Sequence, residues 1–275
     1  MPRPVVLVTG CSEGGIGFAL CEEFARNSCK VYATARNVAK MNGFKDPDIE
    51  KLSLDVTSDA EVQSVVRTVL EKEGCIDILV NNAGIMAAGP LIDQTMEFVQ
   101  EAFNANTFSV LRICKAVIPA MASRKSGIIV NIGSVVGEAP TPWNGLYCAT
   151  KSAVSMMSEV LNMECRPFNI HVMNIEPAAI KSNISSNQQA RFSLPQDSLY
   201  AAFLPNIMQR IHASQGPSSM PNEKFAKIAV QKILSHSPPL HLIIGGGAIL
   251  FKVFRWFPRT LLLWLMWKVY SKKLA

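Results

Sequence analysis

The chain has 275 residues, a length that suits one α/β domain with a large hydrophobic core. Hydrophobic residues make up 49% of it and charged residues 17%, a composition that excludes global disorder. The formal net charge is +6, and basic residues are dense between aromatic residues near the C-terminus, which favours a membrane surface over nucleic acid as a partner.

The cysteines and histidines indicate neither a disulfide framework nor a metal site. Seven cysteines are scattered without a Cys-x-x-Cys pair, and the four histidines are dispersed. An odd, scattered set of cysteines is typical of reduced thiols. The chain also enters a predicted strand almost at its start, without a secretory signal. We therefore expect a cytosol-facing protein.

Short apolar runs alternate with segments whose apolar residues have helical spacing along the first 244 residues. The predicted strands are 4–8, 30–34, 52–54, 76–80, 127–132, 170–175 and 240–244. The predicted helices are 15–27, a helix to residue 73 that opens with the capping box Ser58-Asp-Ala-Glu61, 99–123, and a helix that carries Tyr147 and runs to about residue 165. This alternation predicts a single Rossmann-type, doubly wound parallel sheet of seven strands with helices on both faces.

Two regions depart from the alternation. Residues 178–221 mix apolar residues with Ser, Asn, Gln and Pro, and they leave the carboxyl end of the sixth strand, where open α/β sheets bind ligands. We interpret this insert in the domain 1–244 as an irregular substrate loop, because so long a connection is usually a lid or a disordered segment. Residues 245–275 form an apolar, basic C-terminal tail.

The tail contains two apolar stretches, 242–251 and 261–267, bounded by Lys and Arg. Neither reaches the roughly 20 residues that a membrane-spanning helix needs. Trp256, Trp264 and Trp267 beside basic residues suit a helix that lies in the membrane interface. The alternative is a helix that packs over the substrate pocket or against a second subunit.

A glycine-rich turn, Thr9-Gly-Cys-Ser-Glu-Gly-Gly-Ile-Gly17, joins the first predicted strand to the first helix. Such a turn lets backbone N–H groups approach the pyrophosphate of a dinucleotide. The second strand ends in Thr34-Ala-Arg36, without the acidic residue that would bind a free ribose 2′-OH. Arg36 suits a 2′-phosphate and favours NADP(H), although its position alone fits an ordinary exposed arginine equally well.

Tyr147 and Lys151 are four residues apart on a predicted helix, so both side chains lie on one face. A free phenol titrates near ~10. A neighbouring ammonium favours the phenolate and lowers that pKa, so Tyr147 would exchange a proton with a carbonyl oxygen. On its own, the pair also fits a surface tyrosine and a solvated lysine.

The complete pattern resembles the short-chain dehydrogenase/reductase family over residues 4 to about 182, with a weaker seventh strand. Tyr147 follows Ser134 by 13 residues, as the family's geometry requires. The matching residues are Thr9, Gly10, Gly15, Ile16, Gly17, Asp55, Asn81, Asn82, Ala83, Gly84, Asn106, Ser134, Tyr147, Lys151 and Pro177.

The resemblance implies a role for each catalytic residue. Tyr147 would be the acid in reduction and the base in oxidation, and Ser134 would hydrogen-bond the substrate carbonyl. Lys151 would tune Tyr147 and hold the nicotinamide ribose, Asn106 would anchor a water in the proton relay, and Asp55 would meet the adenine. The implied cofactor-binding residues are Gly10, Ser12, Gly15, Ile16, Gly17, Arg36, Asp55, Asn82, Ala83, Gly84, Tyr147, Lys151, Pro177 and Ile180.

Two departures from the family pattern affect the cofactor site. The glycine loop has one extra residue, and Glu13 lies within it, where an acid would repel a pyrophosphate unless it points outward. After the sixth strand, Pro177-Ala178 replaces the usual Pro-Gly.

The glycine loop, Tyr32-Ala-Thr-Ala-Arg36 and Ala179-Ile-Lys-Ser-Asn183 look like the NADPH-dependent 1-acyldihydroxyacetone-phosphate reductases of fungi and plants. We therefore expect an NADPH-dependent carbonyl reductase that acts on a lipophilic small molecule. The alternatives are a hydroxysteroid, retinoid or terpenoid dehydrogenase, or a cofactor-binding scaffold without turnover. The expected location is a cytosol-facing membrane surface, of the endoplasmic reticulum or a lipid droplet, or otherwise the cytoplasm, with a second copy of the chain as a further candidate partner.

Overall fold

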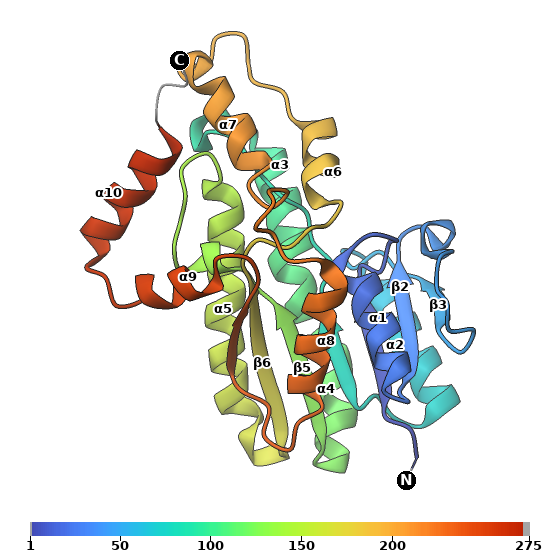
Figure 1. The fold of residues 1–275 in the computed structure, drawn as a ribbon. Helices are drawn as coiled ribbons and strands as arrows, with labels where there is room; N and C mark the ends of the chain where they lie inside the picture. The colour runs from blue at the N-terminus through green and yellow to red at the C-terminus, as the bar shows by residue number, and fades with distance from the viewer. Residues whose placement is uncertain (1, 272–275) are drawn as a thin grey trace.

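The computed structural model of the chain describes residues 2–271. Its centre is a seven-stranded sheet in the order β3-β2-β1-β4-β5-β6-β7, and every neighbouring pair is parallel (Figure 1). The strands are β1 (Val5–Thr9), β2 (Lys30–Ala35), β3 (Glu50–Ser53), β4 (Ile78–Asn81), β5 (Gly127–Ile132), β6 (Ile170–Pro177) and β7 (His241–Ile244). The predicted doubly wound sheet is confirmed.

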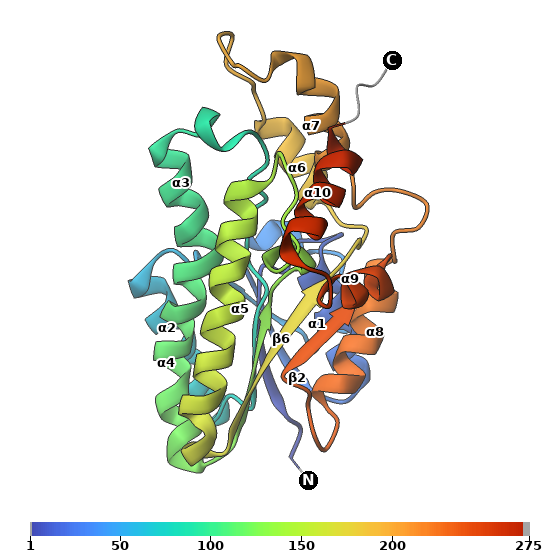
Figure 2. The same ribbon diagram turned by 90° about the vertical axis from the view of Figure 1, so that its left-hand side faces the viewer.

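Helices cover both faces of the sheet, as Figure 2 shows from the side. α1 packs against α8 on one face, and α2, α4 and α5 lie over the other. The helices are α1 (Ile16–Arg26), α2 (Asp59–Glu73), α3 (Met96–Phe103), α4 (Ser109–Arg124), α5 (Gly145–Cys165), α6 (Ile184–Arg191), α7 (Leu204–Ile211), α8 (Asn222–Ile233), α9 (Ala248–Phe254) and α10 (Arg259–Tyr270).

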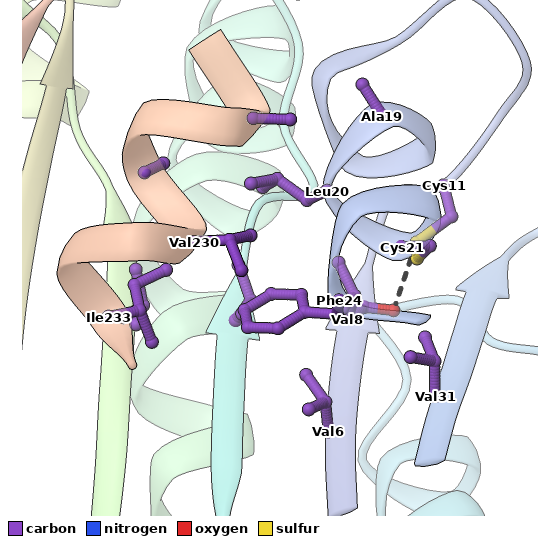
Figure 3. Packing of buried hydrophobic residues seen from close by; sticks show 14 of the residues in the cluster. Val6, Val8, Cys11, Ala19, Leu20, Cys21, Phe24, Val31, Val230 and Ile233 are labelled. Atoms are coloured by element: carbon purple, nitrogen blue, oxygen red, sulfur yellow. Dashed lines mark hydrogen bonds between the residues drawn. The ribbon is translucent and has the colours of Figure 1, made fainter. Parts of the chain in front are cut away.

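The alternation of side chains along β1 produces the two-sided core. Val6 and Val8 belong to the cluster of α1 and α8, where they pack with Phe24 (Figure 3). Val5 and Leu7 belong to the cluster on the opposite face. Both faces of the strand are therefore buried, which explains why its sequence is a continuous apolar run.

The predicted helix 99–123 is two α-helices joined by a π turn, Asn104–Phe108. It begins earlier than expected because the Thr95 hydroxyl caps α3 by accepting the N–H of Phe98 at 3.2 Å. Single π turns often occur at functional sites. This one carries the buried Asn106.

The insert 178–221 is more regular than the sequence analysis expected. It contains α6 and α7, and only the segments around them are irregular. Ile207 and Ile211 lie one turn apart on α7, and both are buried in a cluster with Trp143. Polar residues between these two isoleucines hid a short amphipathic helix from the sequence reading.

The tail consists of the short helices α9 and α10, which pack on the domain through one side. Phe254, Leu262 and Met266 are buried against Ala139. Within residues 2–271, no helix combines the length and the apolar character that crossing a membrane requires. Residues 272–275 of the predicted tail lie outside the described part of the chain.

A row of three asparagines crosses the sheet near its carboxyl edge, because Asn81, Asn131 and Asn174 are register partners on β4, β5 and β6. Asn81 Nδ2 donates to Asn131 Oδ1 at 2.9 Å, and Asn131 Nδ2 donates to Ser158 Oγ on α5 at 2.9 Å. Asn174 Nδ2 donates to Ser155 Oγ, also on α5, at 3.1 Å. The row thus fixes α5 to β5 and β6, and links β4 to β5.

We predict that Asn131→Ala lowers the free energy of unfolding by about 2–4 kcal/mol, because it removes the buried partner of Asn81 and of Ser158. Urea denaturation followed by circular dichroism measures the change. His171→Ala, at an exposed position on β6, is the matched control and should stay within about 0.5 kcal/mol. A loss in Asn131→Ala no larger than in this control would contradict a structural role for the row.

Candidate active site

A cavity of about 260 Å³ is lined by residues at the carboxyl ends of β5 and β6 and by residues of α6 and α7. Figure 1 shows α6 and α7 beyond these strand ends. Ser134 reaches the cavity from the end of β5, and Tyr147 and Lys151 reach it from α5. The structure therefore brings together the three residues that the sequence analysis selected for proton transfer. The other predicted residues in its wall are Ile16, Asn82, Gly84, Pro177 and Ile180.

Lys151 is buried and held by two contacts. Its Nζ donates a hydrogen bond of 2.7 Å to the carbonyl oxygen of Ile132 and lies 5.7 Å from the centre of the Tyr147 ring. Ser134 lines the same cavity and lowers the pKa of the Tyr147 phenol as a hydrogen-bonding group. The three side chains form one connected group on the first turns of α5 and the end of β5.

The two titrating groups of this site are shifted in opposite directions. Burial raises the pKa of the Tyr147 phenol to about 12, against the opposing charge of Arg210 and the hydrogen bond of Ser134. Burial lowers the pKa of Lys151 to about 8. The predicted decrease in the pKa of Tyr147 is therefore wrong, because the effect of burial is larger than that of the positive charge of Arg210. At neutral pH the phenol is protonated and the ammonium is mostly charged.

Asn106 connects the turn at residues 82–85 to helix α5. Its Oδ1 accepts the N–H of Ile85 at 2.7 Å, and its Nδ2 donates to the carbonyl of Ile85 at 2.9 Å and to Thr150 Oγ1 at 3.1 Å. A Cβ at Gly84 would lie 2.9 Å from Asn106 Oδ1, so the turn fits this contact only with glycine. In the structure Asn106 holds the 82–85 turn against α5, and its role in a water relay remains a prediction.

The glycine loop and the Asn82-Ala83-Gly84 turn are hydrogen-bonded to each other. Asn82 Nδ2 donates to the carbonyls of Thr9 and Gly10 at 2.8 and 3.0 Å, while Thr9 Oγ1 accepts the N–H groups of Asn82 and Ala83. Gly10 has a φ of +72°, and a Cβ at Gly17 would lie 2.6 Å from Gly10 O. Both positions therefore require glycine.

The N-terminus of α1 opens at this loop. Gly15 is its N-cap residue, and no side chain caps the first turn. Ser12 lies in the loop and accepts the N–H of Gly15 through its carbonyl. The backbone N–H groups of the first turn suit a phosphate. Glu13 is exposed, with its carboxylate against Gly43 of a neighbouring loop, so it points outward as expected.

Arg36 and Asp55 lie together at the ends of β2 and β3. Burial would raise the pKa of Asp55, but hydrogen bonds from Thr57 and the charges of Arg36 and Arg112 lower it overall. The Arg36 side chain is exposed, and no group within residues 2–271 hydrogen-bonds its guanidinium. The Arg36 guanidinium is therefore available to bind a phosphate group at the surface.

Several residues of the cavity wall were not predicted from the sequence, and three of them bear polar or aromatic groups from distant segments. Arg210 from α7, Thr141 and Tyr270 from α10 all line it. Trp143 Nε1 donates a hydrogen bond of 2.8 Å to the carbonyl of Tyr270, which holds the end of α10 over the cavity. The contact of Tyr270 with the cavity agrees with one alternative from the sequence, a tail helix that packs over the substrate pocket. No motif marks Arg210.

An ionic cluster around the buried Glu176 joins the tail to the loop that follows Ser134. Arg255 pairs with Glu176 at 2.8 Å and with Glu138, and His241 Nδ1 lies 2.9 Å from Glu176. Glu138, Glu176 and His241 are close enough to share a cation. The Arg255 guanidinium already supplies the positive charge between the two carboxylates, so the cluster is an anchor for the tail.

Comparison with known proteins places this geometry in a family. A model of short chain dehydrogenases matches residues 4–192. A short-chain dehydrogenase of Penicillium ochrochloron is 35% identical over 86% of this chain and 86% of its own length. The NADPH-dependent 1-acyldihydroxyacetone phosphate reductase of Saccharomyces cerevisiae is 30% identical over 99% of this chain and 91% of its own length.

Solved structures agree with these relatives. A short-chain dehydrogenase from Streptomyces avermitilis superposes with a TM-score of 0.81 at 30% identity, covering 92% of both chains. One from Sphingobium yanoikuyae, in complex with NADPH, superposes with a TM-score of 0.71 at 30% identity, covering 87% of both chains. Together with the match over residues 4–192, these likenesses show that the chain belongs to the short-chain dehydrogenase family.

Proposed function

We propose that this chain is an NADP(H)-dependent carbonyl reductase that acts on a lipophilic ketone. The observation that carries the proposal is the meeting of Ser134, Tyr147 and Lys151 in one cavity that also has an apolar wall. A scaffold without turnover has no use for a buried ammonium beside a half-buried phenol, because burying such a charge costs free energy.

The protein residues supply proton transfer and orientation. Tyr147 is protonated at neutral pH because burial raises its pKa, so it can donate its proton to the carbonyl oxygen of a ketone. Ser134 donates a hydrogen bond to the same oxygen, and the charge of Lys151 stabilises the phenolate that remains. When bound, the cofactor supplies the hydride.

The cofactor is NADP(H). The open N-terminus of α1, and the Gly10 and Gly17 positions that a Cβ would fill, fit a pyrophosphate. We assign Arg36 to the 2′-phosphate and Asp55 to the adenine end, because the two lie together at the ends of β2 and β3. The Sphingobium yanoikuyae structure contains NADPH, and the Saccharomyces cerevisiae reductase is NADPH-dependent.

For the substrate we propose a long-chain acyl ketone phosphate, 1-acyldihydroxyacetone phosphate being the leading candidate. The apolar part of the wall includes Met86, Ile184 and Phe251, which suit an acyl chain. Support also comes from the Saccharomyces cerevisiae relative, whose match extends over 99% of this chain and thus includes the tail.

We further propose that the tail binds a cytosol-facing membrane surface, of the endoplasmic reticulum or a lipid droplet, through the side that the domain leaves uncovered. Ile249 is 79% exposed, Trp256 89% and Trp264 50%. Lys252 lies on α9 and Lys268 lies on α10. Exposed tryptophans beside lysines suit the interface of an anionic bilayer.

A second copy of the chain is the partner proposed for the outer face of the α4 and α5 layer. Five large apolar side chains are exposed there, and such a cluster is typical of a subunit interface. They are Phe108 and Leu111 at the start of α4, and Met156, Val160 and Met163 on α5.

Replacing Tyr147 by Phe removes the proton donor and keeps the ring. We expect kcat for reduction of a long-chain ketone to fall by about 10²–10⁴-fold, because general acid catalysis contributes an effect of this size. The Kd of NADPH, measured by fluorescence titration, should change by less than about threefold. Tyr200→Phe is the matched control, since Tyr200 packs on Trp143 outside the cavity wall. Near-wild-type kcat in Tyr147→Phe would refute the mechanism.

Arg36→Asp tests the choice of cofactor. A charge-assisted contact with the 2′-phosphate is worth about 1.5–3 kcal/mol, so the Kd of NADPH should rise roughly tenfold or more while that of NADH changes little. Arg67→Asp, at an exposed position on α2, makes the same change of charge away from the site. An equal loss of affinity for both cofactors would show that Arg36 has a structural role instead.

The double variant Ile249→Glu, Trp256→Glu tests membrane binding without opening the cavity, because both side chains are exposed. We expect it to lose most of its flotation with anionic liposomes, since two charges replace the inserted apolar groups. Ile92→Glu, at a position 68% exposed outside the tail, should float like the wild type. Flotation of the double variant at the wild-type level would mean that the tail does not bind the membrane.

A further inference from the structure

The proposed mechanism leaves one buried cation of the cavity without a role. Arg210 of α7 is 7% exposed and lines the cavity together with Tyr147 and Ser134. Its Nε donates a hydrogen bond of 2.8 Å to Thr141 Oγ1. The central carbon of its guanidinium lies 5.8 Å from the centre of the Tyr270 ring. Three separate segments thus hold the guanidinium in the wall: the insert 178–221, the loop before α5 and the tail.

The ion pairs within residues 2–271 distinguish Arg210 from two other arginines, Arg255 and Arg191. Arg255 pairs with Glu138 and Glu176, and the exposed Arg191 pairs with Glu101. Among residues 2–271, by contrast, no carboxylate lies within ion-pair distance of Arg210. A buried charge without a counterion is unfavourable, and an anion that enters the cavity would relieve that cost.

We propose that Arg210, supported by Thr141, is the binding site for an anionic group of the substrate, a phosphate monoester or a carboxylate. The proposal rests on the carbonyl reductase function proposed above. A guanidinium presents several N–H donors in a fork that matches the oxygens of either anion. Thr141 takes only the Nε hydrogen, so the outer edge of the fork is the part that would meet the ligand.

The anionic group belongs close to the ketone. Arg210 and Tyr147 share the cavity wall, and the positive charge of Arg210 acts on the Tyr147 phenol. The apolar residues Met86, Ile184 and Phe251 line the same cavity and would contact a chain. The wall therefore fits an amphiphile with an anionic head, a ketone beside it and an apolar chain. A neutral steroid or terpenoid ketone would offer Arg210 no anionic group.

Substrate preference tests this assignment. We compare kcat/KM for 1-hexadecanoyl dihydroxyacetone phosphate with that for the dephosphorylated ketone, in the wild type, Arg210→Met and Arg210→Lys. The wild type should prefer the phosphate, and Arg210→Met should lose about 10- to 100-fold on the phosphate relative to the neutral ketone. Any effect of Arg210 on the Tyr147 phenol applies to both ketones and cancels in the ratio. Arg210→Lys keeps the charge and should retain part of the preference.

Arg191→Met is the matched control, because Arg191 belongs to the same insert but is exposed and paired with Glu101. It should keep the wild-type ratio. An equal loss of kcat/KM on both ketones in Arg210→Met would overturn the proposal and make Arg210 a structural residue. If Arg210→Met does not fold, Arg210→Lys decides. A preference for the phosphate ketone weaker than in the wild type supports the proposal, and an unchanged preference overturns it.

A binding measurement separates this proposal from the proposed function. Octyl phosphate, octanoate and octanol are titrated calorimetrically in saturating NADP⁺, so that the cofactor site does not bind the anions. Wild-type protein should bind at least one anion more tightly than octanol, and Arg210→Met should lose that difference. The two anions show whether phosphate or carboxylate is preferred. If neither ketone is reduced but the anion still binds through Arg210, the proposed function fails and the anion site stands; equal binding of all three compounds would refute the site.

Discussion

The site depends on the asparagine row that ties α5 to the sheet. β5 ends just before Ser134, α5 carries Tyr147 and Lys151, and two serines of α5 accept hydrogen bonds from Asn131 and Asn174. An apolar contact would hold the helix against the strands but would tolerate sliding along the groove. Buried hydrogen bonds have a direction and a narrow range of length, so they fix the position of the helix along the strand.

The second dependence is electrostatic. Two cations, Lys151 and Arg210, reach one cavity, and burial opposes the charge of any group placed there. Lys151 is compensated by the carbonyl of Ile132 and by the ring of Tyr147. The protein therefore maintains a positive cavity next to a phenol that remains protonated. This is a suitable arrangement for a reaction in which the substrate oxygen gains negative charge before it gains a proton.

Much of the fold was predictable because its signals are local. A strand buried on both faces has a continuous apolar run, as β1 (Val5–Thr9) has in its first four residues. Glycines indicate turns, because only glycine readily adopts the backbone conformations that tight turns require. Tyr147 and Lys151 were recognisable because helical spacing alone places them on one face. The structure confirms these elements and gathers the predicted residues at one edge of the sheet.

The missed features depend on contacts between distant segments. Arg210 belongs to a short helix in a polar insert, and its burial results from Thr141 and Tyr270, which are far away in the sequence. The π turn at Asn104–Phe108 depends on Asn106 reaching Ile85 and Thr150. The direction of the Tyr147 pKa shift depends on how deeply the ring is buried, which neighbouring residues do not indicate.

The contribution of Tyr270 to the cavity has a consequence for the order in which the two halves of the site are completed during synthesis. The glycine loop, the 82–85 turn, Arg36 and Asp55 all lie in the first third of the chain, whereas the last wall of the cavity arrives with residue 270. These nucleotide-binding segments are therefore synthesised long before the residue that completes the substrate pocket. For the same reason, proteolytic trimming or a fusion at the C-terminus would alter the choice of substrate before it alters the choice of nucleotide.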